Sequence, residues 1–135
     1  MPSLVSTYKI LTEYNLVIQN HKGILSLKAY IDFAKKIVSD PLYSQNYNHI
    51  IIIKEAEIKA SFEDLNIYAE FSELNFKKPK NRNIAIITKT PNQVVISTLL
   101  KLLDKRMAQN VEIFSTTKSA VKWLGIDEKL LSNLL

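Results

Sequence analysis

Short apolar runs alternate along the chain with longer segments in which apolar residues recur every three or four positions. The runs are rich in Val, Ile and Leu, which favour strands. The first two are separated by a short segment that contains Glu13 and Tyr14, so they predict an antiparallel pair with a turn near residues 12–14. Four consecutive isoleucines at 50–53 are typical of a strand covered on both faces. The predicted strands are 8–11, 15–19 (ended by Gly23), 50–53, 84–87 and 111–114.

The segments between these strands have the spacing of amphipathic helices. Each predicted helix follows a residue whose side chain can accept a hydrogen bond from the first helical turn. Asp40 and Pro41 end the first helix, because proline disfavours helical geometry in the residue before it. The predicted helices are 27–38, 62–74, 91–108, 120–124 and a tail helix 127–135, with Ser26, Ser61, Thr90, Thr116 and Asp127 as N-caps.

The order of these elements predicts an α/β fold. Strands that alternate with helices require crossover connections and therefore a mainly parallel sheet. We expect four to five strands, with an antiparallel strand at one edge. No linker or low-complexity segment interrupts the alternation, so the chain is predicted to be a single domain over 1–135, with a core at about 7–125 and the C-terminal helix at 127–135.

Composition narrows the class of protein. Hydrophobic residues make up 47% of 135 residues, which is enough for a packed core. The chain has no cysteine, which excludes disulfides, thiolate zinc sites and cysteine nucleophiles. No segment resembles a secretory signal, and the longest apolar run is far too short to span a membrane. We therefore expect a cytoplasmic protein without a membrane span.

The chain carries a net charge of +5, from 18 basic and 13 acidic residues. Only Lys77, Lys78, Lys80 and Arg82 cluster, in a proline-containing connection. A short charged run of this kind is more often a solvated loop than a site for an anionic partner. Because aromatic residues that could stack on bases are not interleaved with these cations, nucleic acid is not an expected partner.

The sequence contains no convincing catalytic, cofactor or metal site. Two glycines cannot form the phosphate-binding loops of dinucleotide or P-loop proteins. Lys54 follows the isoleucine strand where a phospho-receiver domain requires an acid. His21 and His49 have no third ligand at metal-binding spacing, so we interpret them as ordinary surface or strand-end residues. These observations predict a protein that is not an enzyme and needs no cofactor or metal.

Three hydroxyl residues follow predicted strands and precede predicted helices. Ser61, Thr90 and Thr116 would lie at the carboxyl edge of the sheet, where open α/β proteins bind ligands. There they could form a phospho-acceptor or an anion site. N-capping alone explains all three positions, and it is the explanation that we favour.

Apolar residues occupy more of the predicted helix 91–108 than a one-sided helix requires, and the tail adds further leucines. The tail could pack on this helix within the monomer. The same residues could instead form a homodimer contact or line an apolar ligand pocket. The candidate interface residues are Val95, Leu99, Leu103, Leu130 and Leu134.

The chain combines paired opening strands, Gly23 with Ser26, residues 39–43 (SDPLY), the strand 50–53, residues 61–65 (SFEDL), the strand 111–114 and the ending 120–125 (AVKWLG). In these features and their order it resembles the STAS superfamily, which includes sulfate-transporter and anti-sigma-factor-antagonist domains. It is most similar to the stand-alone bacterial SpoIIAA-like proteins, over about residues 7–125. The resemblance implies a non-enzymatic module for regulation or protein interaction. Ser61 occupies the place of the serine or threonine that is phosphorylated in antagonists, but Ala60 and Phe62 do not match that pattern.

Two functions follow from these observations. The first is a regulatory or protein-interaction module with an unidentified protein partner, which could also form a homodimer. The alternative is a binder of a small apolar or amphiphilic ligand, since related folds carry apolar pockets.

Overall fold

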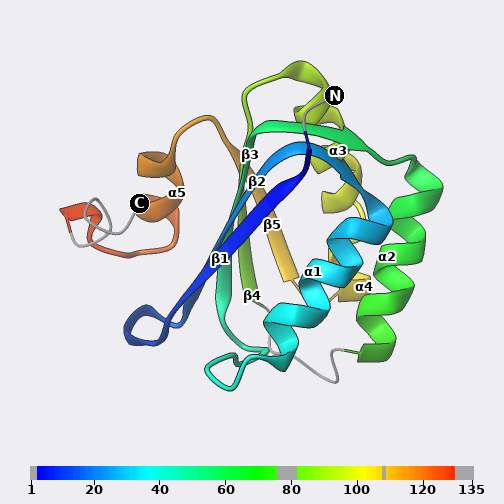
Figure 1. Ribbon diagram of the computed structural model, residues 1–135. Coiled ribbons are helices and arrows are strands. Elements are labelled where there is room, and N and C mark those ends of the chain that lie inside the picture. The colour runs from blue at the N-terminus through cyan, green and yellow to red at the C-terminus, as the bar shows by residue number, and fades with distance from the viewer. Residues whose placement is uncertain (1–2, 76–81, 108, 130–135) are drawn as a thin grey trace.

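A five-stranded sheet forms the centre of the protein, which we describe from a computed structural model that covers residues 3–75, 82–107 and 109–129. The strands lie side by side in chain order (Figure 1). β1 pairs with β2 antiparallel, and the other three pairings are parallel. The predicted α/β sheet with one antiparallel edge strand is thus confirmed. The strands are β1 (Val5–Leu11), β2 (Leu16–Ser26), β3 (Asn48–Lys59), β4 (Arg82–Ile87) and β5 (Gln109–Phe114).

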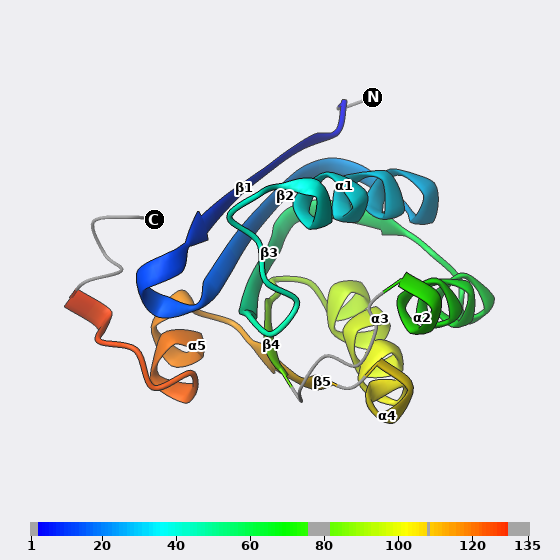
Figure 2. The ribbon, with the colours of Figure 1, turned by 90° about the horizontal axis from the view of Figure 1, so that it is seen from below.

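The helices cover the two faces of the sheet unequally. Viewed along the sheet, α1 to α4 lie on one face and α5 lies on the other (Figure 2). Within the described residues, no helix is both long and apolar enough to cross a membrane. The helices are α1 (Leu27–Ser39), α2 (Phe62–Asn75), α3 (Pro91–Lys101), α4 (Asp104–Met107) and α5 (Thr117–Trp123), with a 3-10 turn η1 (Thr12–Tyr14) between β1 and β2.

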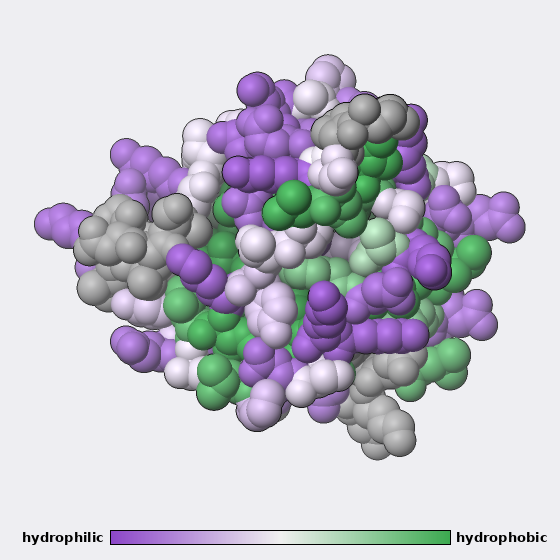
Figure 3. All heavy atoms as spheres, viewed as in Figure 1, coloured by the Kyte–Doolittle hydropathy of each residue, from purple (hydrophilic) through white to green (hydrophobic). Residues whose placement is uncertain are grey.

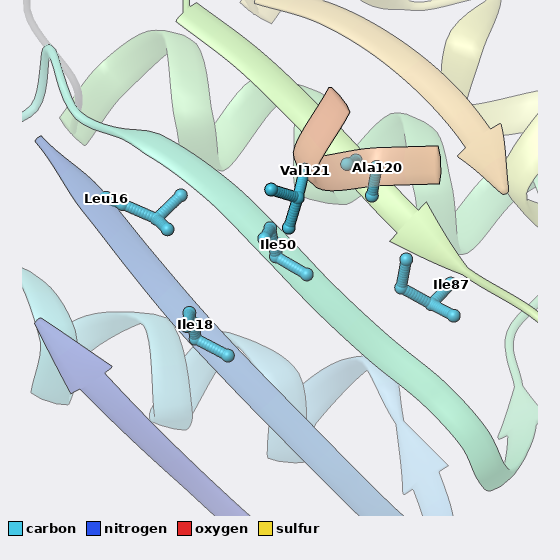
Figure 4. Close-up of a cluster of buried hydrophobic side chains, with 7 residues drawn as sticks. Leu16, Ile18, Ile50, Ile87, Ala120 and Val121 are labelled. Atoms are coloured by element: carbon cyan, nitrogen blue, oxygen red, sulfur yellow. The ribbon is translucent and has the colours of Figure 1, made fainter. Parts of the chain in front are cut away.

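The run of four isoleucines at 50–53 in β3 supplies both layers of the core. Because side chains alternate along a strand, Ile50 points to the α5 face, whereas Ile51 and Ile53 point to the face that α1 to α4 cover. On the α5 side, Ile50 packs in a cluster closed by Ala120 and Val121 of α5 (Figure 4). The other members of that cluster are Leu16, Ile18, Ala85 and Ile87.

Strands β2 and β3 extend further than their apolar runs predicted. Gly23 does not end β2, because the parallel pairing continues from Gly23↔Ala56 to Ser26↔Lys59. The longer ladder includes polar residues such as Lys22 and Glu55, and an apolar run does not reveal them.

The predicted helix 91–108 is also different in the structure. It is divided into α3 and α4, with Leu102 and Leu103 between them. Of the predicted tail helix, the described part reaches Lys129, and Leu130, Leu131, Leu134 and Leu135 lie outside the described residues.

Gln93 connects α3 to the part of β3 that extends past β4. The last pair between these strands is Ile52↔Ile87, so the backbone of β3 beyond Ile52 has no strand partner on the β4 side within the described chain. The Gln93 amide Nε2 donates to the carbonyl oxygens of Ile53 and Ala56 at 2.8 Å each. Its Oε1 accepts from the backbone N–H of Thr90 at 3.0 Å, which completes a capping box. One side chain therefore satisfies both the strand edge and the helix start.

Gly23 should be the less replaceable of the two glycines. A Cβ at Gly23 would lie 2.3 Å from the Ser3 backbone oxygen, and its φ is +97°. At Gly125 φ is +73°, but no atom lies near a new Cβ. We expect Gly125→Ala to cost about 1–2 kcal/mol from backbone strain alone, and Gly23→Ala to cost about 2–4 kcal/mol because the clash is added. Urea unfolding of both variants measures this, and equal losses would contradict it.

Candidate functional site

A cavity of about 130 Å³ lies between the sheet and helices α1, α2 and α3. Most of its wall is apolar, contributed by strands β2 to β4 and by the inner faces of the three helices. Two of its lining residues, Ser26 and Val38, are exposed, so the cavity reaches the protein surface. Its apolar lining is formed by Leu25, Leu27, Ala34, Ile37, Val38, Ile51, Ile53, Ile58, Ala60, Leu65, Ile84, Ile86, Ile96 and Leu100.

Three polar side chains of the cavity lie where three parallel strands begin. His49, Arg82 and Gln109 lie at or next to the first residue of β3, β4 and β5, and all three line the cavity. Residues two and four positions further along the same strands, such as Ile51 and Ile84, point to the same face and are apolar. The cavity thus has a polar end at the strand starts and an apolar end further along the sheet.

A chain of hydrogen bonds connects the edge strand β1 to this polar end. Ser6 Oγ lies 2.8 Å from His21 Nδ1, and His21 Nε2 lies 2.9 Å from Gln19 Oε1. Gln19 Nε2 lies 3.1 Å from His49 Nδ1. Because an amide oxygen only accepts and an amide nitrogen only donates, each neutral imidazole carries its proton on Nε2. His49 therefore presents an Nε2–H donor, and this buried atom has no hydrogen-bond partner among the described residues.

Both histidines are held neutral by burial. His21 is fully buried, and burial lowers its pKa to about 4. His49 is 6% exposed, and burial together with the nearby charge of Arg82 lowers its pKa to about 3. Neither imidazole carries a charge near neutral pH.

Arg82 supplies the formal positive charge at the polar end of the cavity. Its guanidinium, 5% exposed, donates to Tyr43 Oη at 3.2 Å and, at a long 3.5 Å, to Gln109 Oε1. Both acceptors are neutral, and burial raises the pKa of Tyr43, so this phenol stays protonated. Burial likewise raises the pKa of Tyr30 and Tyr68, which also line the cavity. No Asp or Glu is among the described residues that line the cavity.

The positions of these residues correct two sequence interpretations. Both histidines are buried rather than at the surface, although His49 does lie at a strand end, and Arg82 opens a buried strand instead of lying in a solvated loop. Lys77, Lys78 and Lys80 lie outside the described residues. The burial of His21 can be predicted from the sequence, because the alternation of side chains along a strand places His21 on the same face as Val17. The burial of Arg82 cannot be predicted in this way, since an arginine next to three lysines has the pattern of a loop.

The structure places the three predicted hydroxyl residues at helix starts, where their oxygens accept backbone N–H groups. Ser61 accepts from Asp64, Thr90 from Gln93 and Thr116 from Ser119. All three are exposed. Ser61 lies apart from the other two, because β3 continues to Lys59 beyond its last pair with β4. Capping accounts for each residue.

The candidate interface residues have different environments. Leu103 is buried beside Leu65, Ala69 and Met107, and Leu99 packs against the same cluster. Val95 is 57% exposed. Leu130 and Leu134 are outside the described residues. Internal packing therefore explains part of the wide apolar stripe but not Val95.

The described part of the chain contains no group of three or more His, Cys, Asp or Glu that could hold a metal ion. The chemical capacity of the site is therefore that of its cavity: an apolar wall, neutral hydroxyl and imidazole donors, and one buried cation.

Comparison with known proteins shows the fold. No family model matches the chain. No curated protein matches it either. Among solved structures, an uncharacterised DUF3478-family protein from Shewanella loihica PV-4, described as having a SpoIIAA-like fold, is similar with a TM-score of 0.58. The two share 16% sequence identity, and the match covers 92% of this chain and 98% of that chain. The chain thus has a SpoIIAA-like fold, as the resemblance of its sequence implied.

The buried histidines should make stability depend on pH. Their folded pKa values lie below that of an unfolded histidine, so the unfolded state binds more protons once the pH falls below about 6.5. Their contribution is fully present above that value and is lost as the pH falls towards 4. Between pH 7.5 and 5 we expect a loss of about 2 kcal/mol per histidine.

Urea unfolding at these two pH values measures the loss, and His49→Gln should remove about half of the difference. The window ends at pH 5 because ordinary carboxylates titrate below it. An unchanged free energy of unfolding across the window would contradict the neutral, buried state of these imidazoles.

Proposed function

We propose that the protein is a non-enzymatic binding module that holds a small amphiphilic molecule in the cavity between the sheet and helices α1 to α3. The observation that carries the proposal is the polarity of this cavity, which changes from His49 and Arg82 at the strand starts to isoleucines further along. A molecule with one polar and one apolar end complements such a wall.

The size of the cavity agrees with a small ligand. A water molecule needs roughly 10–15 Å³ of such space, so the 130 Å³ cavity has room for about ten waters or for an apolar molecule of similar extent. An apolar cavity of this size is costly to leave empty, because its lining loses packing contacts. A bound molecule would restore these contacts.

The fold is compatible with binding without catalysis. The described cavity wall offers no carboxylate, and the imidazole of His49 is neutral, which supports a role in binding. Its donors are suited to holding and orienting a molecule.

Filling the cavity should weaken binding. Ala34 of α1 is 7% exposed and lines the cavity. Ala34→Leu adds three carbons there and should weaken binding of the fluorescent apolar probe N-phenyl-1-naphthylamine by at least about tenfold. Lys36→Leu, at an exposed position of the same helix, is the matched control and should bind the probe like the wild type.

Urea unfolding separates a filled cavity from a damaged fold, because Ala34→Leu should keep or raise stability. A wild-type protein that binds no probe and from which no molecule is released by organic extraction would overturn the proposal.

A second function, protein interaction, is favoured by apolar side chains that the monomer leaves exposed. Val95 and Leu102 are 57% and 71% exposed and lie seven residues apart, on one side of α3 and its C-terminal cap. Figure 3 shows other hydrophobic residues, in green, between hydrophilic ones on the face that it displays. We propose that α3 contacts a protein partner, with a second copy of the chain as the simplest case.

Sedimentation velocity tests this second function. If the chain self-associates through α3, the double variant Val95→Glu with Leu102→Glu should sediment as a monomer at concentrations where the wild type is dimeric. Lys122→Glu, on α5 across the sheet, is the control and should leave the dimer intact. If the wild-type protein remains monomeric at every concentration tested, a second copy of the chain is not the partner of α3.

A further inference from the structure

The polar end of the cavity has the charge and the donors to select the head group of a ligand. This inference about the head group rests on the proposed function, because it concerns which amphiphile binds in the same cavity. Two groups carry the argument, the buried guanidinium of Arg82 and the buried Nε2–H of His49. Both residues line the cavity and belong to neighbouring strands.

The direction of the hydrogen bonds fixes what His49 can offer. Gln19 Nε2 donates to His49 Nδ1 at 3.1 Å, and the orientation of that amide is held by His21 and Tyr30, which both donate to Gln19 Oε1. His49 can therefore only donate at Nε2. A buried donor without a partner costs free energy, and a ligand acceptor would recover it.

Arg82 adds a fixed positive charge beside this donor. Arginine stays protonated in proteins, and its planar group suits the two oxygens of a carboxylate. The 3.5 Å bond to Gln109 Oε1 is long, so a ligand oxygen could replace this amide at little cost. With no acid in the described lining, the polar end carries one positive charge and complements one negative charge.

We propose that the ligand is a mono-anionic amphiphile, a medium-chain carboxylate, whose head group accepts hydrogen bonds from His49 Nε2–H and from the Arg82 guanidinium. Its chain extends along the isoleucines of β3 and β4. A chain of eight to twelve carbons matches the roughly ten-water extent of the cavity.

Three ligands with the same ten-carbon chain test the head group on the wild-type protein. Decanoate, 1-decanol and decylamine are each titrated against the bound N-phenyl-1-naphthylamine probe at pH 7.5, below their aggregation limits. Decanoate should displace the probe at a concentration at least about tenfold lower than 1-decanol. Decylammonium should be the weakest competitor, because Arg82 repels it.

Variants then assign the preference to residues. Arg82→Met should weaken decanoate by at least about tenfold while 1-decanol stays within about twofold. His49→Phe should produce a smaller loss of the same kind. Arg106→Met, at an exposed arginine that pairs with Glu73, is the control and should change neither ligand.

The outcomes separate this inference from the proposed function. Equal displacement by decanoate and 1-decanol would overturn the head-group inference and leave the amphiphile cavity standing. A probe that does not bind the wild type would overturn both. Because the comparison of the three ligands needs no substitution, an Arg82 variant that fails to fold does not prevent the decision.

Discussion

Strand β3 carries apolar side chains on both faces, and both faces have to be removed from water. Ile50 and Ile51 are neighbours in the chain, yet they belong to separate clusters on opposite sides of the sheet. The α5 side is closed by one short helix with small residues, Ala120 and Val121, that come close to the strands. On the other side three longer helices have to close over a larger area, and they leave the cavity there. The unequal covering of the two faces thus decides on which one a cavity remains.

The polar end of the cavity is formed by residues at the amino ends of the strands. In open α/β sheets ligands commonly bind beyond the carboxyl ends of the strands. Here the carboxyl ends are occupied by helix caps, since Thr90 and Thr116 each accept a backbone N–H. His49, Arg82 and Gln109 instead converge at the amino ends, inside the layer between sheet and helices. Their burial keeps the imidazole neutral and sets the guanidinium against an apolar wall.

Much of the fold could be predicted from the sequence, because strand type, helix spacing and N-caps are local properties. The isoleucine run of β3, the cap at Ser26 and the antiparallel edge all depend on neighbouring residues, and the structure confirms them. The cavity could not be predicted in this way. His49 and Arg82 meet only because β3 and β4 pair with His49 opposite Ile84, and this register depends on the packed sheet. A basic cluster at 77–82 has the composition of a loop, so the buried arginine at its end was misassigned.

The contact that Gln93 makes with β3 has a consequence for how the chain behaves in a crowded solution. Unpaired carbonyl groups along a strand offer a template on which another chain can add, and this is a common route to aggregation. Gln93 holds the carbonyls of Ile53 and Ala56 with hydrogen bonds made by a side chain rather than by a further strand. These two carbonyl groups of the extended half of β3 are thereby unavailable to a further strand. A single amide on α3 thus covers carbonyl groups on which another strand could otherwise pair.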